Sequence, residues 1–156
     1  MYCSLSPSSV LTFDIEKIEI SDLYEFVSIG LKEDEDLINK YHFQDENMQL
    51  LIENNIKNIT ELAVTKPVVC YGLFLEGQAI GFSVICERLL YSFGINVYCR
   101  QREIVLEWFK RIRLIMKDNF VVCLYRENTR AINFFLRNGL EEFSEDGKVI
   151  YLLYSK

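Results

Sequence analysis

Histidine and cysteine, the residue types most often used to bind a metal, are scattered along this sequence. The 156 residues contain one histidine, His42, and five cysteines, and no two cysteines form a Cys-x-x-Cys pair. Zinc sites need several such ligands brought together, commonly at short spacings. Most of the cysteines lie in apolar stretches, where cysteine behaves as a small hydrophobic side chain. We therefore expect no metal site.

Charged residues divide the chain into halves of opposite sign. Residues 1–87 carry 5 basic and 15 acidic side chains, a net charge of −10, and residues 88–156 carry 12 basic and 8 acidic side chains, a net charge of +4. The acidic run Glu33–Asp36 could attract an amine, although such a run also suits a solvated turn.

Nucleic-acid binding by the basic half is not expected, because no recognition motif and no interleaved exposed aromatic residues accompany its cations. The cations concerned are Lys110, Arg111, Arg113, Lys117, Arg126, Arg130 and Arg137. An accessory protein that binds nucleic acid through them is the third of three functional interpretations.

Size and composition predict one soluble domain. Half of the residues are hydrophobic and 13% are aromatic, which is too apolar for a disordered chain. We expect residues 1–12 to form an N-terminal tail and residues 13–156 to form a single domain. No apolar run reaches the roughly 18 residues that span a bilayer, and the first residues do not resemble a signal peptide. The expected location is cytoplasmic, with no membrane partner.

Periodicity predicts a strand followed by two helices in the first part of the domain. Residues 13–20 alternate between apolar and charged side chains, as a half-buried strand does. Ser21 is a candidate N-cap of a helix that Gly30 would end. Apolar residues at helical spacing predict a second helix over residues 46–59.

Short apolar runs separated by turn residues follow Pro67. We expect strands over residues 68–75, 79–86, 89–98, 120–125, 140–143 and 149–154, and helices over residues 102–117 and 129–138. Gly139 stands where a helix commonly ends in a left-handed conformation. This order of elements predicts an α/β (α+β) fold with a mixed, mostly antiparallel sheet.

The segment Asn128–Leu140, which reads NTRAINFFLRNGL, carries the most specific pattern in the chain. It resembles the N-x-x-A-x-x-F-Y-x-x-x-G-F signature that follows the fifth strand of GNAT N-acetyltransferases. The hairpins before and after this segment are also placed as in that family. The resemblance implies a GNAT-like sheet of six to seven strands with helices on both faces. The residues in register are Asn128, Ala131, Phe134 and Gly139.

In the GNAT family, acetyl-CoA lies between two splayed strands, and an R/Q-x-x-G-x-G/A loop holds its pyrophosphate through backbone N–H groups. Glycine lets that backbone approach the phosphates closely. If Arg102 takes the leading position here, Val105 and Glu107 replace the two glycines, so we expect no cofactor. Should acetyl-CoA bind, the resemblance implies Arg100, Arg102 and Asn128 as its contacts.

A second departure from the family concerns the proton donor. Many members have a tyrosine after Phe134 that protonates the departing CoA thiolate, whereas this chain has Phe135. Loss of a general acid typically lowers a rate by about 10² to 10⁴. Tyr125 and Tyr98 are the candidates to substitute for it, although tyrosines in apolar strands also serve simply to pack.

These departures favour a catalytically degenerate GNAT-fold protein that acts through protein–protein contacts, either with itself or in an assembly. The chain is similar in this respect to small GNAT-like proteins of short-tailed phages, some of them virion-associated, which implies a location in the host cytoplasm or the virion. The alternative is an acetyl-CoA-dependent N-acyltransferase acting on a small amine or a protein amine.

Overall fold

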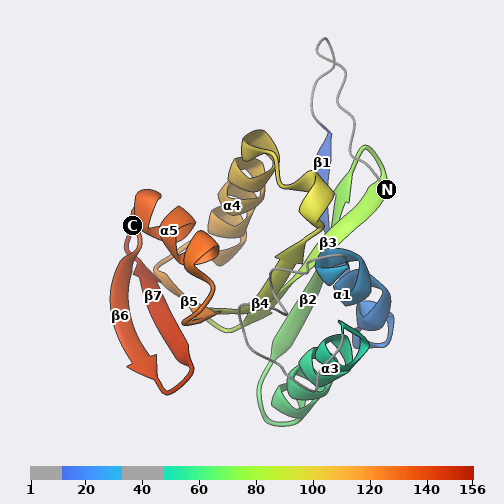
Figure 1. The fold of residues 1–156 in the computed structure, drawn as a ribbon, viewed down its shortest axis with the longest axis horizontal. Coiled ribbons are helices and arrows are strands. Elements are labelled where there is room, and N and C mark those ends of the chain that lie inside the picture. The colour runs from blue at the N-terminus through green and yellow to red at the C-terminus, as the bar shows by residue number, and fades with distance from the viewer. Residues whose placement is uncertain (1–11, 33–47) are drawn as a thin grey trace.

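A seven-stranded mixed sheet organises the part of the chain that the computed structural model describes, residues 12–32 and 48–156 (Figure 1). The strands are β1 (Phe13–Ile18), β2 (Val68–Leu75), β3 (Gln78–Cys86), β4 (Leu89–Ile95), β5 (Phe120–Tyr125), β6 (Glu141–Asp146) and β7 (Val149–Tyr154). The α-helices are α1 (Leu23–Leu31), α3 (Met48–Thr65), α4 (Arg102–Met116) and α5 (Thr129–Arg137). This architecture confirms the predicted fold class.

The strand order is β1-β2-β3-β4-β5-β7-β6, and every neighbouring pair is antiparallel except β4 and β5. That parallel pair sits at the centre of the sheet, where the α4 crossover joins its two strands. The fifth strand therefore pairs with a neighbour at each edge, and its side chains are alternately buried and half-buried up to the exposed Tyr125.

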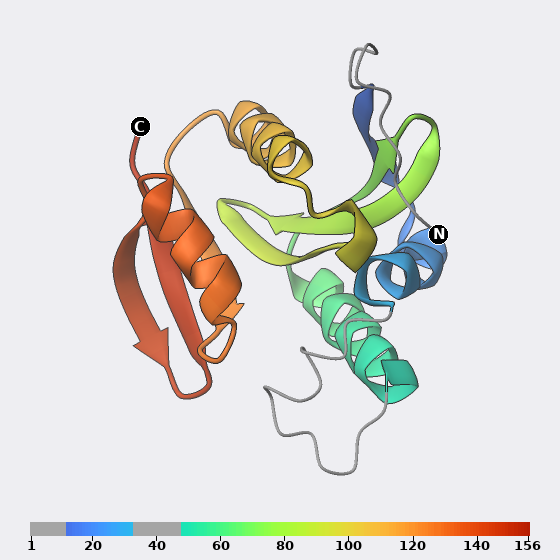
Figure 2. The same ribbon diagram turned by 45° about the horizontal axis from the view of Figure 1, so that its top comes forward.

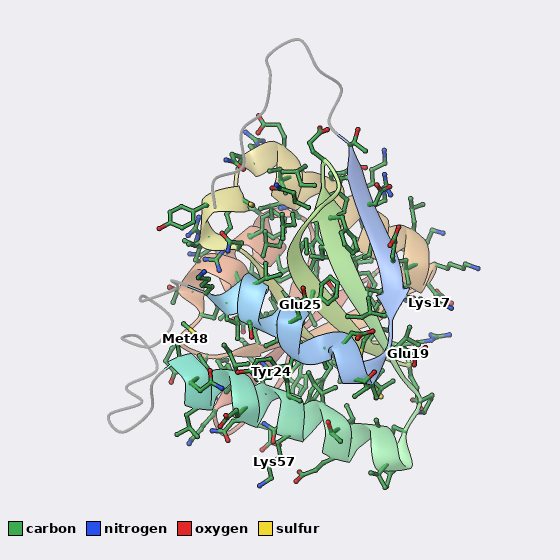
Figure 3. The ribbon with its side chains drawn as sticks, turned by 90° about the vertical axis from the view of Figure 1, so that its right-hand side faces the viewer. Lys17, Glu19, Tyr24, Glu25, Met48 and Lys57 are labelled. Carbon is green, nitrogen blue, oxygen red and sulfur yellow. The ribbon has the colours of Figure 1, made fainter. Side chains whose placement is uncertain are left out.

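Helices cover both faces of the sheet and give the domain two hydrophobic cores. In Figure 2, α4 lies on one side of β3 and β4, and α1 and α3 lie on the other. The core beneath α4 and α5 includes Trp108, Phe109 and Phe135, and the core beneath α1 and α3 includes Ile59 and Phe82. Figure 3 shows Tyr24 between α1 and α3, where its hydroxyl accepts a hydrogen bond from the Gln49 amide.

The prediction that Gly30 ends the first helix is wrong, because α1 continues through it to Leu31. A Cβ atom at Gly30 would lie 2.9 Å from the backbone oxygen of Gly94 and 2.9 Å from Cδ1 of Phe82. The glycine therefore permits a close approach of α1 to the sheet, and a distant strand rather than local turn chemistry requires it. Ser21 also does not cap α1, since it lies within a 3₁₀ turn over Ile20–Asp22.

Several other boundaries differ from the predicted ones, among them the ends of β1, β4, β6 and α3. β4 ends at Ile95, not at residue 98, because Asn96 redirects the chain: its side chain accepts a hydrogen bond from the Tyr98 N–H (3.0 Å) and donates one to the Ile29 carbonyl (2.9 Å). α3 continues to Thr65, since no helix-breaking residue occurs before Pro67. The predicted tail over residues 1–12 falls almost wholly outside the described residues.

The end of α5 matches its prediction. Gly139 follows the helix with φ of +96°, the left-handed region that disfavours other residues. At the start of the same helix, the Asn128 side chain accepts a hydrogen bond from the Ala131 N–H at 3.4 Å. The signature segment thus specifies both ends of α5.

Candidate functional site

The sheet opens at its centre because β4 and β5 separate. Their ladder holds only two residue pairs, Leu89 with Val121 and Leu90 with Val122. Immediately beyond these pairs the register of β4 against β3 shifts, so that Tyr91 is an extra, bulged residue. A bulge bends a strand and increases its twist, which leads β4 away from β5.

A pocket of about 410 Å³ lies on the α4–α5 side of this opening. We call it the arginine pocket. Its wall is largely apolar, with Phe93, Trp108 and Phe135 among the lining side chains. Four arginines also line it, and such a combination suits a ligand with an apolar arm and anionic groups. These are Arg100, Arg102, Arg130 and Arg137.

The arginines of this pocket differ from most others in the described residues. Arg102, Arg130 and Arg137 form no ion pair within residues 12–32 and 48–156. Arg100 is held against the end of β4, where its Nε donates to the Ile95 carbonyl at 2.7 Å. Three unneutralised guanidinium groups around one concave surface concentrate positive potential there.

Other cations of the basic half are engaged in local contacts. Arg111 pairs with Glu107 and Arg126 pairs with Glu145 at 3.0 and 2.9 Å, respectively. The guanidinium of Arg113 lies 4.9 Å from the centre of the Phe109 ring. Of the set considered for nucleic acid, Arg111, Arg113 and Arg126 contact neighbouring side chains, and Arg130 and Arg137 line the arginine pocket.

The wall of the arginine pocket is built from packed rings. Phe135 is fully buried, and its ring centre lies 5.7 Å from that of Phe93, 6.2 Å from that of Trp108 and 5.6 Å from that of Phe109. The Trp108 indole N–H donates to the Ser83 hydroxyl at 2.9 Å, so this buried donor is satisfied. The rings hold one another in place and give the pocket a fixed wall.

A second pocket, of about 400 Å³, lies between α3 and the same strands. We call it the asparagine pocket, because α3 contributes Asn54, Asn55 and Asn58 to it. Leu31, Phe93 and Asn128 line both pockets. The two pockets therefore adjoin at the opening in the sheet.

No family model and no curated protein matches the sequence, but solved structures share this arrangement of strands and helices, and several of them are acetyltransferases. The fold is the GNAT fold. A PaiA N-acetyltransferase from Thermoplasma acidophilum, solved with coenzyme A, is 17% identical, with a TM-score of 0.60 over 93% of this chain and 99% of that one. An acetyltransferase from Thermus thermophilus is 14% identical, with a TM-score of 0.70 over 92% and 96%. A spermidine N-acetyltransferase SpeG chimera from Vibrio cholerae is 10% identical, with a TM-score of 0.60 over 92% and 95%.

The sequence resemblance sets the GNAT phosphate loop against the first turn of α4. Val105 lines the arginine pocket, whereas Glu107 pairs with Arg111. If the motif is counted from Arg100, Glu103 and Val105 stand at the two glycine positions; if it is counted from Arg102, they are Val105 and Glu107. Val105 is thus the replacement common to both registers, and its side chain meets the pocket.

The two tyrosines considered as proton donors lie in different surroundings. Tyr125 lines the asparagine pocket and is 42% exposed. Tyr98 lines neither pocket and lies in the 3₁₀ turn after β4. Tyr91, which the sequence analysis did not single out, also lines the asparagine pocket. Its pKa is raised, chiefly by burial and to a smaller extent by the nearby Cys123. The bulge that places Tyr91 there depends on strand register, for which the residue pattern gave no signal.

Thiol and metal chemistry find no support at these pockets. Burial raises the pKa of the Cys123 thiol, which lines the asparagine pocket, and raises that of Cys70 to about 11. Both thiols are therefore protonated at neutral pH and poorly nucleophilic. Among the described residues, no group of His, Cys, Asp and Glu side chains could hold a metal ion. No helix in this part of the chain is long and apolar enough to cross a membrane.

Proposed function

We propose that this protein is a CoA-dependent N-acyltransferase that takes its acyl donor in the arginine pocket and its amine in the asparagine pocket. The observation that carries the proposal is the meeting of two pockets of different chemistry at Phe93 and Asn128. Transfer between two substrates needs such access from both sides, whereas a protein that acts only through its surface does not.

The residues of the arginine pocket fit a coenzyme A thioester. Arg102, Arg130 and Arg137 match phosphate groups, for which guanidinium is a preferred partner. The aromatic wall matches the apolar arm. When bound, acetyl-CoA would supply a thioester: the amine nitrogen bonds to the acyl carbon, the C–S bond breaks, the amine loses a proton and the thiolate gains one.

Side chains replace the close backbone approach of the usual glycine loop. Val105 keeps the phosphates away from the first amides of α4, so the guanidinium groups must bear most of their charge. The Tyr125 hydroxyl is the proton donor that we assign to the thiolate, since Phe135 has none and Tyr98 lies outside both pockets.

Neither pocket includes a carboxylate or histidine among its described lining residues. No described residue of either pocket is therefore placed to deprotonate a bound amine, so we expect the amine to arrive in its neutral form; the acidic run Glu33–Asp36 lies outside the described residues. The rate should rise with pH until the free amine is neutral, and should then level off.

Release of the CoA thiol in the presence of amines tests the proposal. We expect release to require an amine and to fall by at least about tenfold in kcat/KM in the double variant Arg130→Ala and Arg137→Ala, because two charge-assisted contacts are lost. Arg126→Ala, which removes a cation already paired with Glu145, is the matched control and should retain activity. An equal loss of kcat/KM in Arg126→Ala would mean that the substitutions act through protein stability and not through binding.

A catalytically degenerate protein that acts through protein contacts, in a self-assembly or a phage virion, is the second candidate. Val105 at the glycine position and the fully buried Phe135 favour it. It predicts no thiol release with any amine and no binding of acetyl-CoA. It also predicts a defined oligomer or a bound partner in solution, which light scattering measures directly.

A further inference from the structure

The asparagine pocket is polar without being acidic. Its described lining has side-chain amides, hydroxyls and a thiol, and its only charged residue is Lys57. Figure 3 shows Lys57 projecting from the side of α3 that faces away from α1. A pocket that must hold a polycation needs carboxylates, because a buried cation has to be paired. The described lining offers none.

The asparagines provide hydrogen bonds in several directions. The Oδ1 atom of Asn55 accepts from the Ser92 hydroxyl at 3.3 Å, which links α3 to β4 and fixes the orientation of this amide. Its Nδ2 group can then donate to a ligand. Asn54 and Asn58 lie on the same stretch of helix. Amides are both donors and acceptors and therefore match ligand hydroxyl groups, which are also both.

Two tyrosines line the opposite wall of this pocket, Tyr91 from β4 and Tyr125 from β5. Phenol rings combine an apolar face with a hydroxyl group. A sugar ring has the matching chemistry, since its C–H faces pack on aromatic rings and its hydroxyl groups bond to amides. The pocket of about 400 Å³ has room for one such ring and a substituent.

The absence of a base among the described lining residues bears on the pKa of the amine that the pocket can use. An alkyl amine like that of lysine has a pKa of about 10.4, so only about one molecule in a thousand is neutral at pH 7.5. An amine beside electron-withdrawing groups titrates nearer the α-amino value of about 7.7 to 8.0, and roughly a third is neutral at that pH. A site without a base among its described residues is therefore better served by an amine flanked by oxygen substituents.

From these observations we infer that the acceptor is a hydroxyl-rich primary amine of the amino-sugar class, held by the α3 asparagines, and not a polyamine. The inference rests on the proposed function, in which the arginine pocket holds the acyl donor. It names a substrate chemistry that the fold itself leaves open.

Transfer from acetyl-CoA to glucosamine and to spermidine at pH 7.5 tests the inference. We expect kcat/KM for glucosamine to exceed that for spermidine by at least about tenfold. A higher value for spermidine, with acetyl-CoA bound, would overturn the acceptor class while leaving the proposed function intact.

Substitutions in the asparagine pocket test whether its residues set the preference for glucosamine. Asn55→Leu should lower kcat/KM for glucosamine by at least about fivefold, and Asn133→Leu, at an exposed position of α5 outside both pockets, is the matched control. Because Asn55→Leu also breaks the bond to Ser92, a second variant is needed. Lys57→Glu combined with Asn58→Asp adds acidic groups at exposed positions, where we expect little effect on folding. It should shift the glucosamine-to-spermidine ratio toward spermidine by about threefold or more.

Saturation-transfer NMR on glucosamine, without acetyl-CoA, separates this inference from the proposed function. We expect signal transfer to the sugar protons with the wild type and its loss with Asn55→Leu, but not with Asn133→Leu. If acetyl-CoA fails to bind while this pattern appears, the donor assignment is wrong and the sugar site stands. No transfer to glucosamine at millimolar concentration would overturn the sugar site whatever the outcome for acetyl-CoA.

Discussion

The first turns of α4 and α5 both contribute to the arginine pocket, yet only one of them keeps the GNAT pattern. At α5, Asn128 caps the helix and the small Ala131 lines the pocket. At α4, Gln101 occupies the cap position without a capping hydrogen bond, and Val105 lines the pocket where the family has glycine. The residues at α5 serve the helix itself, whereas glycines at α4 would serve only a ligand. The fold is therefore retained here although the glycines of the phosphate loop are not.

Phe135→Tyr should give the largest effect, because it restores a proton donor on the α5 side of the comparison. If thiolate protonation limits transfer, kcat should rise by about 10- to 100-fold, within the usual range for a general acid. Phe134→Tyr is the matched control, since that ring is also packed against Phe109 but is not at the tyrosine position. An unchanged kcat in Phe135→Tyr would mean that thiolate protonation does not limit transfer.

Gly139→Val should lower the free energy of unfolding by about 1 to 2 kcal/mol, because a β-branched residue resists the left-handed conformation observed there. Urea unfolding followed by circular dichroism measures the change. Gly139→Asn should lose less, since asparagine tolerates that conformation. Equal stability of the valine variant and the wild type would contradict the assigned helix end.

Asn128→Ala and Gln101→Ala test the two helix starts directly. Loss of the Asn128 cap should cost about 1 kcal/mol of stability. Loss of the Gln101 side chain should cost less than loss of the Asn128 cap, since it does not cap α4 and its amide donates a 3.2 Å hydrogen bond to the Tyr98 carbonyl outside the helix. Similar losses in the two variants would remove the contrast between the helices.

Val105→Ala should have the smallest effect, and it should change only the affinity for acetyl-CoA. Removal of two methyl groups lets the phosphates approach the first amides of α4, so the affinity for acetyl-CoA should rise by about two- to fivefold. Calorimetric titration measures this change, and Val64→Ala, at an 81% exposed position, is the control. Weaker binding in Val105→Ala would mean that its side chain contacts the ligand favourably.

Local chemistry was readable from the sequence, and long-range geometry was not. Gly139 was predicted because a left-handed residue at a helix end depends only on the few positions around it. Gly30 was misassigned because its role depends on Gly94 and Phe82, which lie far along the chain. Tyr91 was missed because a bulge depends on pairing between strands.

The two pockets show the same limit. The arginines at positions 100 and 102 were expected from the family loop, whereas Arg130 and Arg137 had been grouped with other basic residues until the fold brought them to the same pocket. The three α3 asparagines had no sequence signal, since polar residues on a helix usually face solvent. They line the asparagine pocket because α3 lies beside β4 and β5.

Titration of the protein with acetyl-CoA, followed by calorimetry and by the thermal unfolding midpoint, tests the central claim most directly. A ligand at a hundred times its dissociation constant stabilises the folded state by about 2.7 kcal/mol. We expect saturable binding with a matching rise in the midpoint, and loss of both when Arg102, Arg130 and Arg137 are replaced by alanine. Absence of heat and of any midpoint shift with the wild type at millimolar acetyl-CoA would contradict the acyltransferase account.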